Sequence, residues 1–173
     1  MTLKNMLLTF ICLLPVMLFA KIKVVTTFSD YASIVKEMGG DLVEVEYLSH
    51  GDQDPHFVPP KPSLAIKLKR ADMLVTTGLD LEMWIATLQD KARNKNIMDG
   101  AVGFVTASPG VELLQKPATA VSRSEGDVHL YGNPHIHTSP VNWKIISDNI
   151  LISLKKVDLQ NASIYEANQK KFK

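Results

Sequence analysis

The sequence has almost no cysteine, and this absence restricts the chemistry that the protein can perform. The only cysteine is Cys12, which lies in an apolar run near the N-terminus. That run belongs to a predicted signal peptide, so the exported chain is expected to contain neither a disulfide nor a thiolate ligand. Any metal site in the exported chain must therefore use imidazole, carboxylate and water.

Residues 1–20 have the pattern of a secretory signal peptide. Lys4 supplies a positive charge, residues 6–19 are uncharged and mostly apolar, and Ala20 is a small residue at the predicted cleavage position. The apolar run is shorter than the roughly 20 residues that a membrane-spanning helix needs. We therefore predict export to the periplasm or to another extracytoplasmic location.

The chain also has no excess of basic charge. It contains 19 Lys and Arg residues against 18 Asp and Glu residues, and removal of residues 1–20 removes one lysine and leaves 18 of each sign. A nucleic-acid-binding domain would show a basic excess, so no nucleic-acid partner is expected. The remaining 153 residues are enough for one domain with a hydrophobic core.

Hydrophobic periodicity predicts an α/β lobe over residues 21–156, with a parallel four-stranded sheet flanked by helices of the (β/α)4 type. Strands are expected at 21–28, 42–48, 71–77 and 101–106, and helices at 29–38, 62–70, 80–93 and 140–156, with one helical turn at 111–114. Strand, helix and strand joined by short connections favour parallel pairing. Asp80 is expected to cap the third helix, and Ser139 with Pro140 to begin the fourth.

Histidines are concentrated in two loops of this predicted lobe. His129, His135 and His137 lie in the segment GDVHLYGNPHIHTSP, and His56 lies in the proline-rich segment HGDQDPHFVPPKP. Neutral imidazole is the commonest protein ligand for zinc and similar metals. Ligands of open α/β sheets bind outside the carboxyl ends of the strands, where these loops are expected to meet. We therefore predict that His56 and His135 bind a metal ion.

The other two histidines of the late loop are expected to assist this pair. Residues two apart in an extended segment point the same way, so His137 could face the same ion as His135. His129 is a candidate auxiliary ligand or a group that orients the site. Asp54 and Asp127 are candidate carboxylates, although acidic side chains in loops are usually solvated.

The sequence contains no positive signal for catalysis. No phosphate-binding loop, nucleophile elbow or zinc-protease helix is present, and Glu82 and Glu125 have no catalytic partner at a readable spacing. Two alternatives to a binding module remain open. One is a secreted zinc metallohydrolase that uses His56, His135 and an acid such as Asp127. The other is a metal-dependent adhesin or interaction protein whose metal contributes folding energy.

Four segments together resemble a known family, the metal-binding solute-binding proteins of ABC transporters for zinc and manganese (ZnuA/TroA-like). They are GDQDPHFVPPKPS, ADMLVTTGLDLEMW, GDVHLYGNPHIHTSP and NASIYEANQKKF, and in this order they extend over the exported chain. The resemblance implies capture of a divalent ion for an ABC permease in the membrane, with Zn²⁺ first and Mn²⁺ or Fe²⁺ as alternatives. It implies no enzymatic activity, and a monomer at full length.

In that family, two α/β lobes are joined by a long helix, and the ion lies between the lobes. The resemblance implies that His56 and His135 are the first lobe's ligands and that residues 157–173 begin the linking helix. We expect the second lobe, with its own histidine or acidic ligands, to be absent from this chain, which would leave apolar surface exposed. The family usually has tryptophan in place of His137 and aspartate in place of Ser139, which leaves a ligand role open for His137.

A site with two imidazoles would bind zinc weakly. Zinc prefers four ligands, and two neutral imidazoles supply half of that set without neutralising its charge. We expect weak Zn²⁺ binding by this chain unless His129, His137 or a second chain completes the coordination. Isothermal titration of the monomeric protein measures this, and nanomolar binding would contradict a site with only two ligands.

Overall fold

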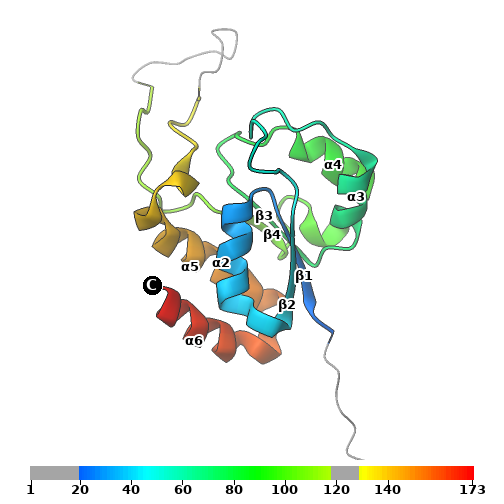
Figure 1. Cartoon of the computed structure of the whole chain (residues 1–173), viewed down its shortest axis with the longest axis vertical. Coiled ribbons are helices and arrows are strands. Elements are labelled where there is room, and N and C mark those ends of the chain that lie inside the picture. The colour runs from blue at the N-terminus through cyan, green and yellow to red at the C-terminus, as the bar shows by residue number, and fades with distance from the viewer. Residues whose placement is uncertain (1–19, 118–128) are drawn as a thin grey trace, which may run out of the picture.

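Four short parallel strands form the centre of the computed structural model, which describes residues 20–117 and 129–173 (Figure 1). The strands are β1 (Ile22–Thr26), β2 (Val43–Tyr47), β3 (Met73–Thr76) and β4 (Phe104–Thr106). Their order in the sheet is β2-β1-β3-β4, and every neighbouring pair is parallel. The predicted α/β fold with a parallel four-stranded sheet is confirmed. Cys12 and almost all of the predicted signal peptide lie outside the described residues.

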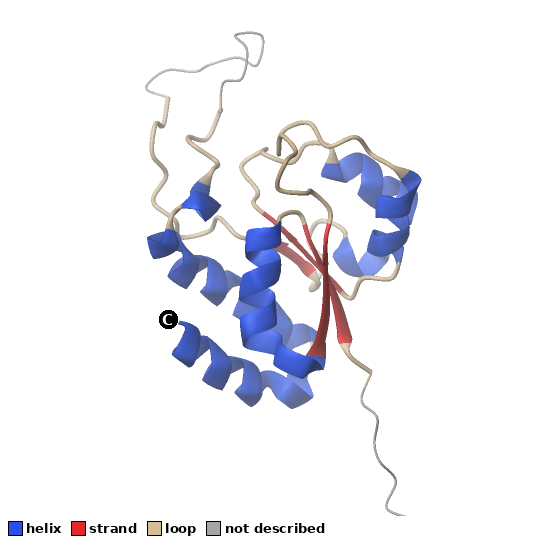
Figure 2. Cartoon of the chain, in the orientation of Figure 1, coloured by secondary structure: helices blue, strands red, loops and turns tan. Residues whose placement is uncertain are grey.

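Helices cover both faces of the sheet, as Figure 2 shows. The helices are α2 (Ser29–Gly39), α3 (Pro62–Lys69), α4 (Ile85–Ala92), α5 (Pro140–Val157) and α6 (Ala162–Phe172). Successive strand residues point to opposite faces, so Val24 and Met73 pack into the core shared with α2, α5 and α6, whereas Val25 and Leu74 pack into the core shared with α3 and α4. Burial on both faces explains why consecutive residues are apolar in β3 and at Val24 and Val25 of β1.

The two C-terminal helices pack on the same side of the sheet as α2 (Figure 1). Pro140 begins α5 as predicted, but Ser139 makes no capping hydrogen bond through its side chain, which corrects the expected cap. Within α6, Tyr165 is fully buried and donates a hydrogen bond to the carboxylate of Asp158, and Asn168 Nδ2 donates to the carbonyl of Met38 at 2.9 Å. None of the helices in the described ranges is long and apolar enough to cross a membrane.

The start of the third helix and the helical turn at 111–114 were also predicted wrongly. The third helix begins at Ile85, not at Asp80, because Leu79 and Asp80 have positive φ angles of 60° and 61° and lie in a turn. No helical turn forms at 111–114, where the chain is irregular. The apolar residues expected on the third helix are nevertheless buried: they are Leu81, Trp84, Ile85 and Leu88.

The fourth strand was expected to begin at Ala101 but begins at Phe104, because residues 101–103 form a bend and a turn. A Cβ atom on Gly103 would lie 2.2 Å from the carbonyl oxygen of Asp72 and 2.6 Å from that of Asn96. Only glycine fits at this position, because both neighbouring atoms belong to the backbone.

A buried carboxyl group connects the ends of two central strands. Glu82 is 4% exposed, and its Oε1 accepts hydrogen bonds from Thr27 Oγ1 and from Thr77 N, each at 2.7 Å. Thr27 follows β1, and Thr77 follows β3. Burial raises the pKa of Glu82 above its ordinary value, although the two hydrogen bonds oppose this shift. Glu82, which appeared only as a weak catalytic candidate in the sequence, therefore has a structural role.

The raised pKa of Glu82 leads us to predict how the free energy of unfolding changes with pH. Above the ordinary glutamate pKa of 4.5, the folded state holds a proton that the unfolded state has lost, so the free energy of unfolding falls as pH rises toward the folded-state pKa. Glu82→Gln keeps the acceptor oxygen and removes the titration. We expect the variant's stability relative to the wild type to grow with pH, by up to about 1.4 kcal/mol for each pH unit in that window.

Urea denaturation at a series of pH values measures this difference. Glu82→Ala serves as the contrasting variant, because it leaves the buried N–H of Thr77 without an acceptor and should cost about 1–3 kcal/mol. Parallel pH profiles for Glu82→Gln and the wild type would contradict a raised pKa.

Candidate metal centre

Both predicted ligands sit in turns of the same construction. Asp54 and Asn133 each precede a proline and a histidine, and each accepts a hydrogen bond through its side-chain Oδ1 from the backbone N–H of that histidine. The distance is 2.9 Å for His56 and 3.0 Å for His135. Such Asx turns are a standard use of these side chains, and the intervening proline fixes one backbone torsion. The sequence therefore fixes the backbone on the N-terminal side of both histidines.

The first loop is anchored to the α3–α4 side of the protein. Trp84 Nε1 donates a hydrogen bond to the carbonyl oxygen of Pro55 at 2.8 Å, which holds the residue immediately before His56. Two residues after His56, Val58 is 2% exposed and belongs to the core between the sheet and these helices. The imidazole of His56 is thus carried on a segment that is fixed on both sides.

The second loop is anchored to the chain that follows β4. The N–H of Asn133 donates to the carbonyl oxygen of Leu114 at 2.8 Å, and Asn133 Nδ2 donates to Gln115 Oε1 at 2.9 Å. Gly132 has a φ of 108°, and a Cβ there would lie 2.9 Å from the same Leu114 oxygen. Ile136 is buried in the main core directly after His135.

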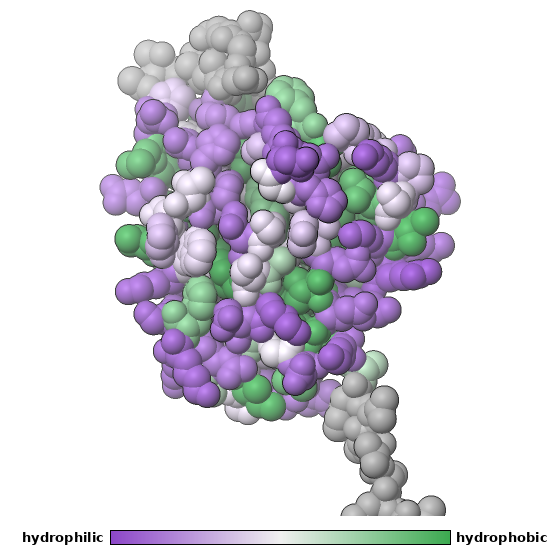
Figure 3. Space-filling view, in the orientation of Figure 1, coloured by the Kyte–Doolittle hydropathy of each residue, from purple (hydrophilic) through white to green (hydrophobic). Residues whose placement is uncertain are grey.

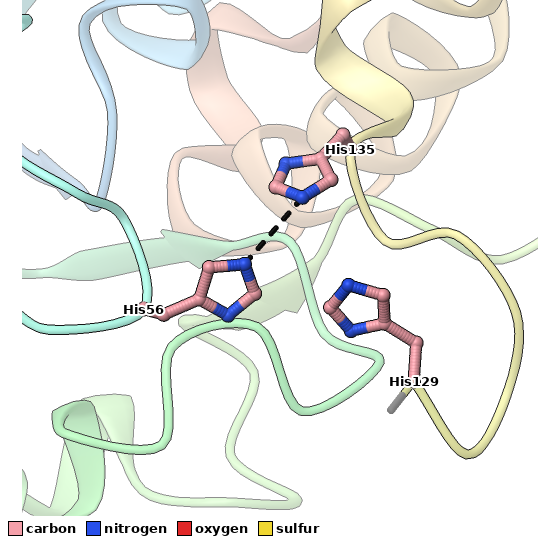
Figure 4. A group of neighbouring side chains, drawn as sticks. All are labelled: His56, His129 and His135. Carbon is pink, nitrogen blue, oxygen red and sulfur yellow. Dashed lines mark hydrogen bonds between the residues drawn. The ribbon is translucent and has the colours of Figure 1, made fainter. Parts of the chain in front are cut away.

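These anchors bring the imidazoles of the two loops together at the carboxyl edge of the sheet. The Nε2 atoms of His56 and His135 are 3.4 Å apart. His129 joins them, since one ring nitrogen from each of the three histidines lies within 4.8 Å of the others. Figure 4 shows the three rings converging from separate segments of the chain. All three side chains are half-buried, so an ion can reach them from solvent.

The environment favours the form of His135 that binds metal. Partial burial lowers its pKa, and the neighbouring His56 and His129 lower it further because their protonated rings would repel it. A lowered pKa keeps the imidazole neutral at lower pH, and the neutral ring is the form that donates an electron pair to a metal.

The structure places His137 outside this group of three. Its ring stacks on Phe28, with centroids 5.1 Å apart, and meets Tyr31 edge to face at 6.0 Å. Its carbonyl oxygen accepts a hydrogen bond from Trp143 Nε1 at 2.7 Å. Its Nδ1 is buried and has no hydrogen-bond partner, and burial lowers the pKa of the ring. His137 thus packs beneath His135 against aromatic side chains.

Several residues that shape the site have no metal-binding pattern in the sequence. Trp84 acts through its indole N–H, and Asn133 acts through its side chain and its backbone. Asp54, a candidate carboxylate ligand, accepts a hydrogen bond from the backbone N–H of His56 through its Oδ1. The one available signal was the pattern Asx-Pro-His, which occurs twice and predicts the turn. Asp127 and Glu125 lie outside the described residues.

Comparison with known proteins identifies the family. A sequence profile of the ZnuA family, described as zinc-uptake complex component A, periplasmic, matches residues 24–173. The chain belongs to this family. ZnuA-family proteins are substrate-binding proteins of ABC transporters for metal ions, with manganese, iron and zinc among their members' metals, and are not enzymes.

Individual relatives agree with this membership. PsaA of Streptococcus pneumoniae, a manganese ABC transporter substrate-binding lipoprotein, is 31% identical over 152 residues, which are 86% of this chain and 46% of PsaA. The iron-binding protein YfeA of Yersinia pestis is 30% identical over 148 residues, which are 86% of this chain and 43% of YfeA. A crystal structure of ZnuA superposes with a TM-score of 0.72 at 27% identity, over 88% of this chain and 55% of that one. The chain thus spans less than half the length of these two curated relatives.

The Asx turn before His56 makes a testable prediction. If Asp54 orients His56 without binding the metal, Asp54→Asn keeps the accepting oxygen and should bind metal like the wild type. Asp54→Ala loses that acceptor and should weaken binding by roughly 10-fold, as is common when a partner of a metal ligand is removed. Isothermal titration with Zn²⁺ measures both variants, and equal weakening by Asn and Ala would show instead that Asp54 is a ligand.

Proposed function

We propose that this chain is the metal-capturing first lobe of an exported substrate-binding protein, which takes up a divalent metal ion for an ABC permease. The observation that carries the proposal is the 3.4 Å approach of the His56 and His135 Nε2 atoms, from two loops that are far apart in the sequence. In a tetrahedral zinc site with Zn–N bonds of about 2.0–2.1 Å, two nitrogen ligands lie roughly 3.3 Å apart. The pair is therefore already spaced for a shared ion.

Zinc is the metal that we propose first, with manganese and then iron as alternatives. Imidazole suits zinc, copper, iron and nickel, whereas carboxylate, carbonyl and water oxygens suit manganese. The ligand group in the described residues consists of imidazoles. The names of the relatives include manganese-, iron- and zinc-binding proteins, so the preference for zinc rests on the donor atoms of this chain.

The surroundings of the site support a role in a larger assembly. Four large apolar side chains in the loops at the carboxyl edge of the sheet are more than half exposed: Phe57, Met83, Leu114 and Tyr131. The face in Figure 3 is mainly hydrophilic, with hydrophobic side chains in separate patches, and exposed apolar side chains such as Leu159 and Val141 also lie outside these loops. Exposed apolar groups around a polar site are typical of a surface that another protein surface covers. We propose that a second lobe or the permease contacts this edge, outside the cytoplasm.

The metallohydrolase and adhesin alternatives rank below this function. A hydrolase needs a general base beside the metal and an open coordination position. An adhesin with a structural metal would lose its fold on chelation. The proposed capture function differs from both, because the ion is cargo: the chain should remain folded without it and should turn over no ester or phosphate substrate.

The proposed ligands make a direct prediction. His56→Ala and His135→Ala should each lower Zn²⁺ affinity by at least roughly 100-fold, since loss of a direct ligand should exceed the 10–100-fold effect of losing a ligand's partner. His50→Ala is the matched control, because His50 is exposed and its ring contacts Tyr47, 5.7 Å between centroids, away from the cluster.

Isothermal titration of the purified chain gives the affinities, and thermal unfolding without metal shows whether each variant is folded. Wild-type affinity in both folded variants, His56→Ala and His135→Ala, would refute the proposed site. An equal loss in His50→Ala would show that the effect is not specific to the cluster.

A further inference from the structure

A third imidazole lies beside the His56–His135 pair, and we propose that His129 is a direct ligand of the captured ion. This inference rests on the proposed function and deepens it, because it completes the donor set from this chain alone. The lobe then holds zinc through three nitrogen atoms and leaves one coordination position for water or an exchangeable donor. Three protein ligands and one open position are a common arrangement for zinc.

The arrangement of the three rings carries this assignment. The ring of His129 stacks on that of His56 with centroids 5.2 Å apart and an interplanar angle of 21°. It meets the ring of His135 edge to face, with centroids 5.7 Å apart and an angle of 84°. Each ring therefore neighbours the other two, and one nitrogen atom from each ring lies within 4.8 Å of the others, so that the three atoms form a triangle (Figure 4).

A small movement of the His129 side chain would bring its nitrogen to ligand spacing from the other two histidines. The His56–His135 nitrogen distance of 3.4 Å matches the roughly 3.3 Å expected for two ligands of tetrahedral zinc. One ring nitrogen of His129 lies no farther than 4.8 Å from one ring nitrogen of each of the other two histidines. A shift of about 1.5 Å or less, through rotation about the side-chain torsions, brings this ring to the same spacing. Its backbone is part of a turn, in which Gly132 N donates to the His129 carbonyl oxygen at 3.3 Å.

The identity of the third donor determines which metal the lobe prefers. A third nitrogen strengthens binding of zinc, for which imidazole is well suited, more than binding of manganese, which prefers oxygen ligands. His137 does not provide this donor in the structure, because its ring packs on Phe28 and Tyr31. His129 is thus the residue that sets the preference of this lobe for zinc over manganese.

The test compares Zn²⁺, Co²⁺ and Mn²⁺ binding by the purified chain and by His129→Ala, His129→Gln, His56→Ala and the control His50→Ala. Titration calorimetry gives the affinities, visible absorption of the Co²⁺ complex reports its geometry, and light scattering reports the oligomeric state. We expect both His129 variants to lose at least roughly 100-fold in zinc affinity. They should lose much less in manganese affinity, and the intense absorption of four-coordinate Co²⁺ should be replaced by the weak absorption of a six-coordinate ion.

The variants separate this inference from the proposed function. If His56→Ala abolishes binding while both His129 variants keep wild-type zinc affinity and the wild-type Co²⁺ spectrum, His129 is not a ligand and the proposed function still stands. If His56→Ala also binds normally, the proposed function fails as well. Zinc-dependent dimerisation of the wild type would overturn the inference too, because a second copy would then complete the site.

Discussion

The arrangement of the site depends on the buried carboxyl group of Glu82. A single oxygen of this group accepts hydrogen bonds from Thr27 and Thr77, the residues that follow β1 and β3. These two strands are adjacent at the centre of the sheet, and the site lies beyond their carboxyl ends. Burial makes the ionised form of this carboxyl group costly and raises its pKa, and the two hydrogen bonds satisfy its buried oxygen. Glu82 therefore connects the segments that follow the two central strands, at the point where the loops begin.

The same short segment also positions the loop that carries His56. Two residues after Glu82, the indole N–H of Trp84 holds the carbonyl oxygen of Pro55, which immediately precedes His56. A hydrogen bond of this kind contributes about 1 kcal/mol to stability, but its direction also fixes the path of the loop. Residues 78–84 thus join the sheet to the site, which explains why this stretch has positive φ angles and turns where a helix was expected.

The sequence predicts the sheet and its covering helices well, because the pattern of buried residues in each strand or helix is visible within a short stretch of sequence. The apolar runs of β1 and β3, Pro140 at the start of α5 and the Asx-Pro-His patterns can all be read locally. The start of α4 could not be predicted, because the buried contacts of Glu82 override the helical pattern around Asp80. The different positions of His129 and His137 could not be predicted either, because sequence spacing alone does not show that one ring stacks on His56 and the other on Phe28.

The chemistry of the proposed site also explains how this chain could bind the ion first and receive the last ligand from another surface later. Three neutral imidazoles supply electron pairs but no negative charge, so the charge of a bound divalent ion is not compensated by its ligands. The remaining coordination position therefore favours an anionic donor. Exposed apolar side chains such as Phe57 and Tyr131 lie in the same loops as His56 and His129, and they offer a contact area to the surface that brings this donor. An ion held by the proposed three ligands would stay exchangeable until a second surface arrives, which is the property that the proposed capture function requires.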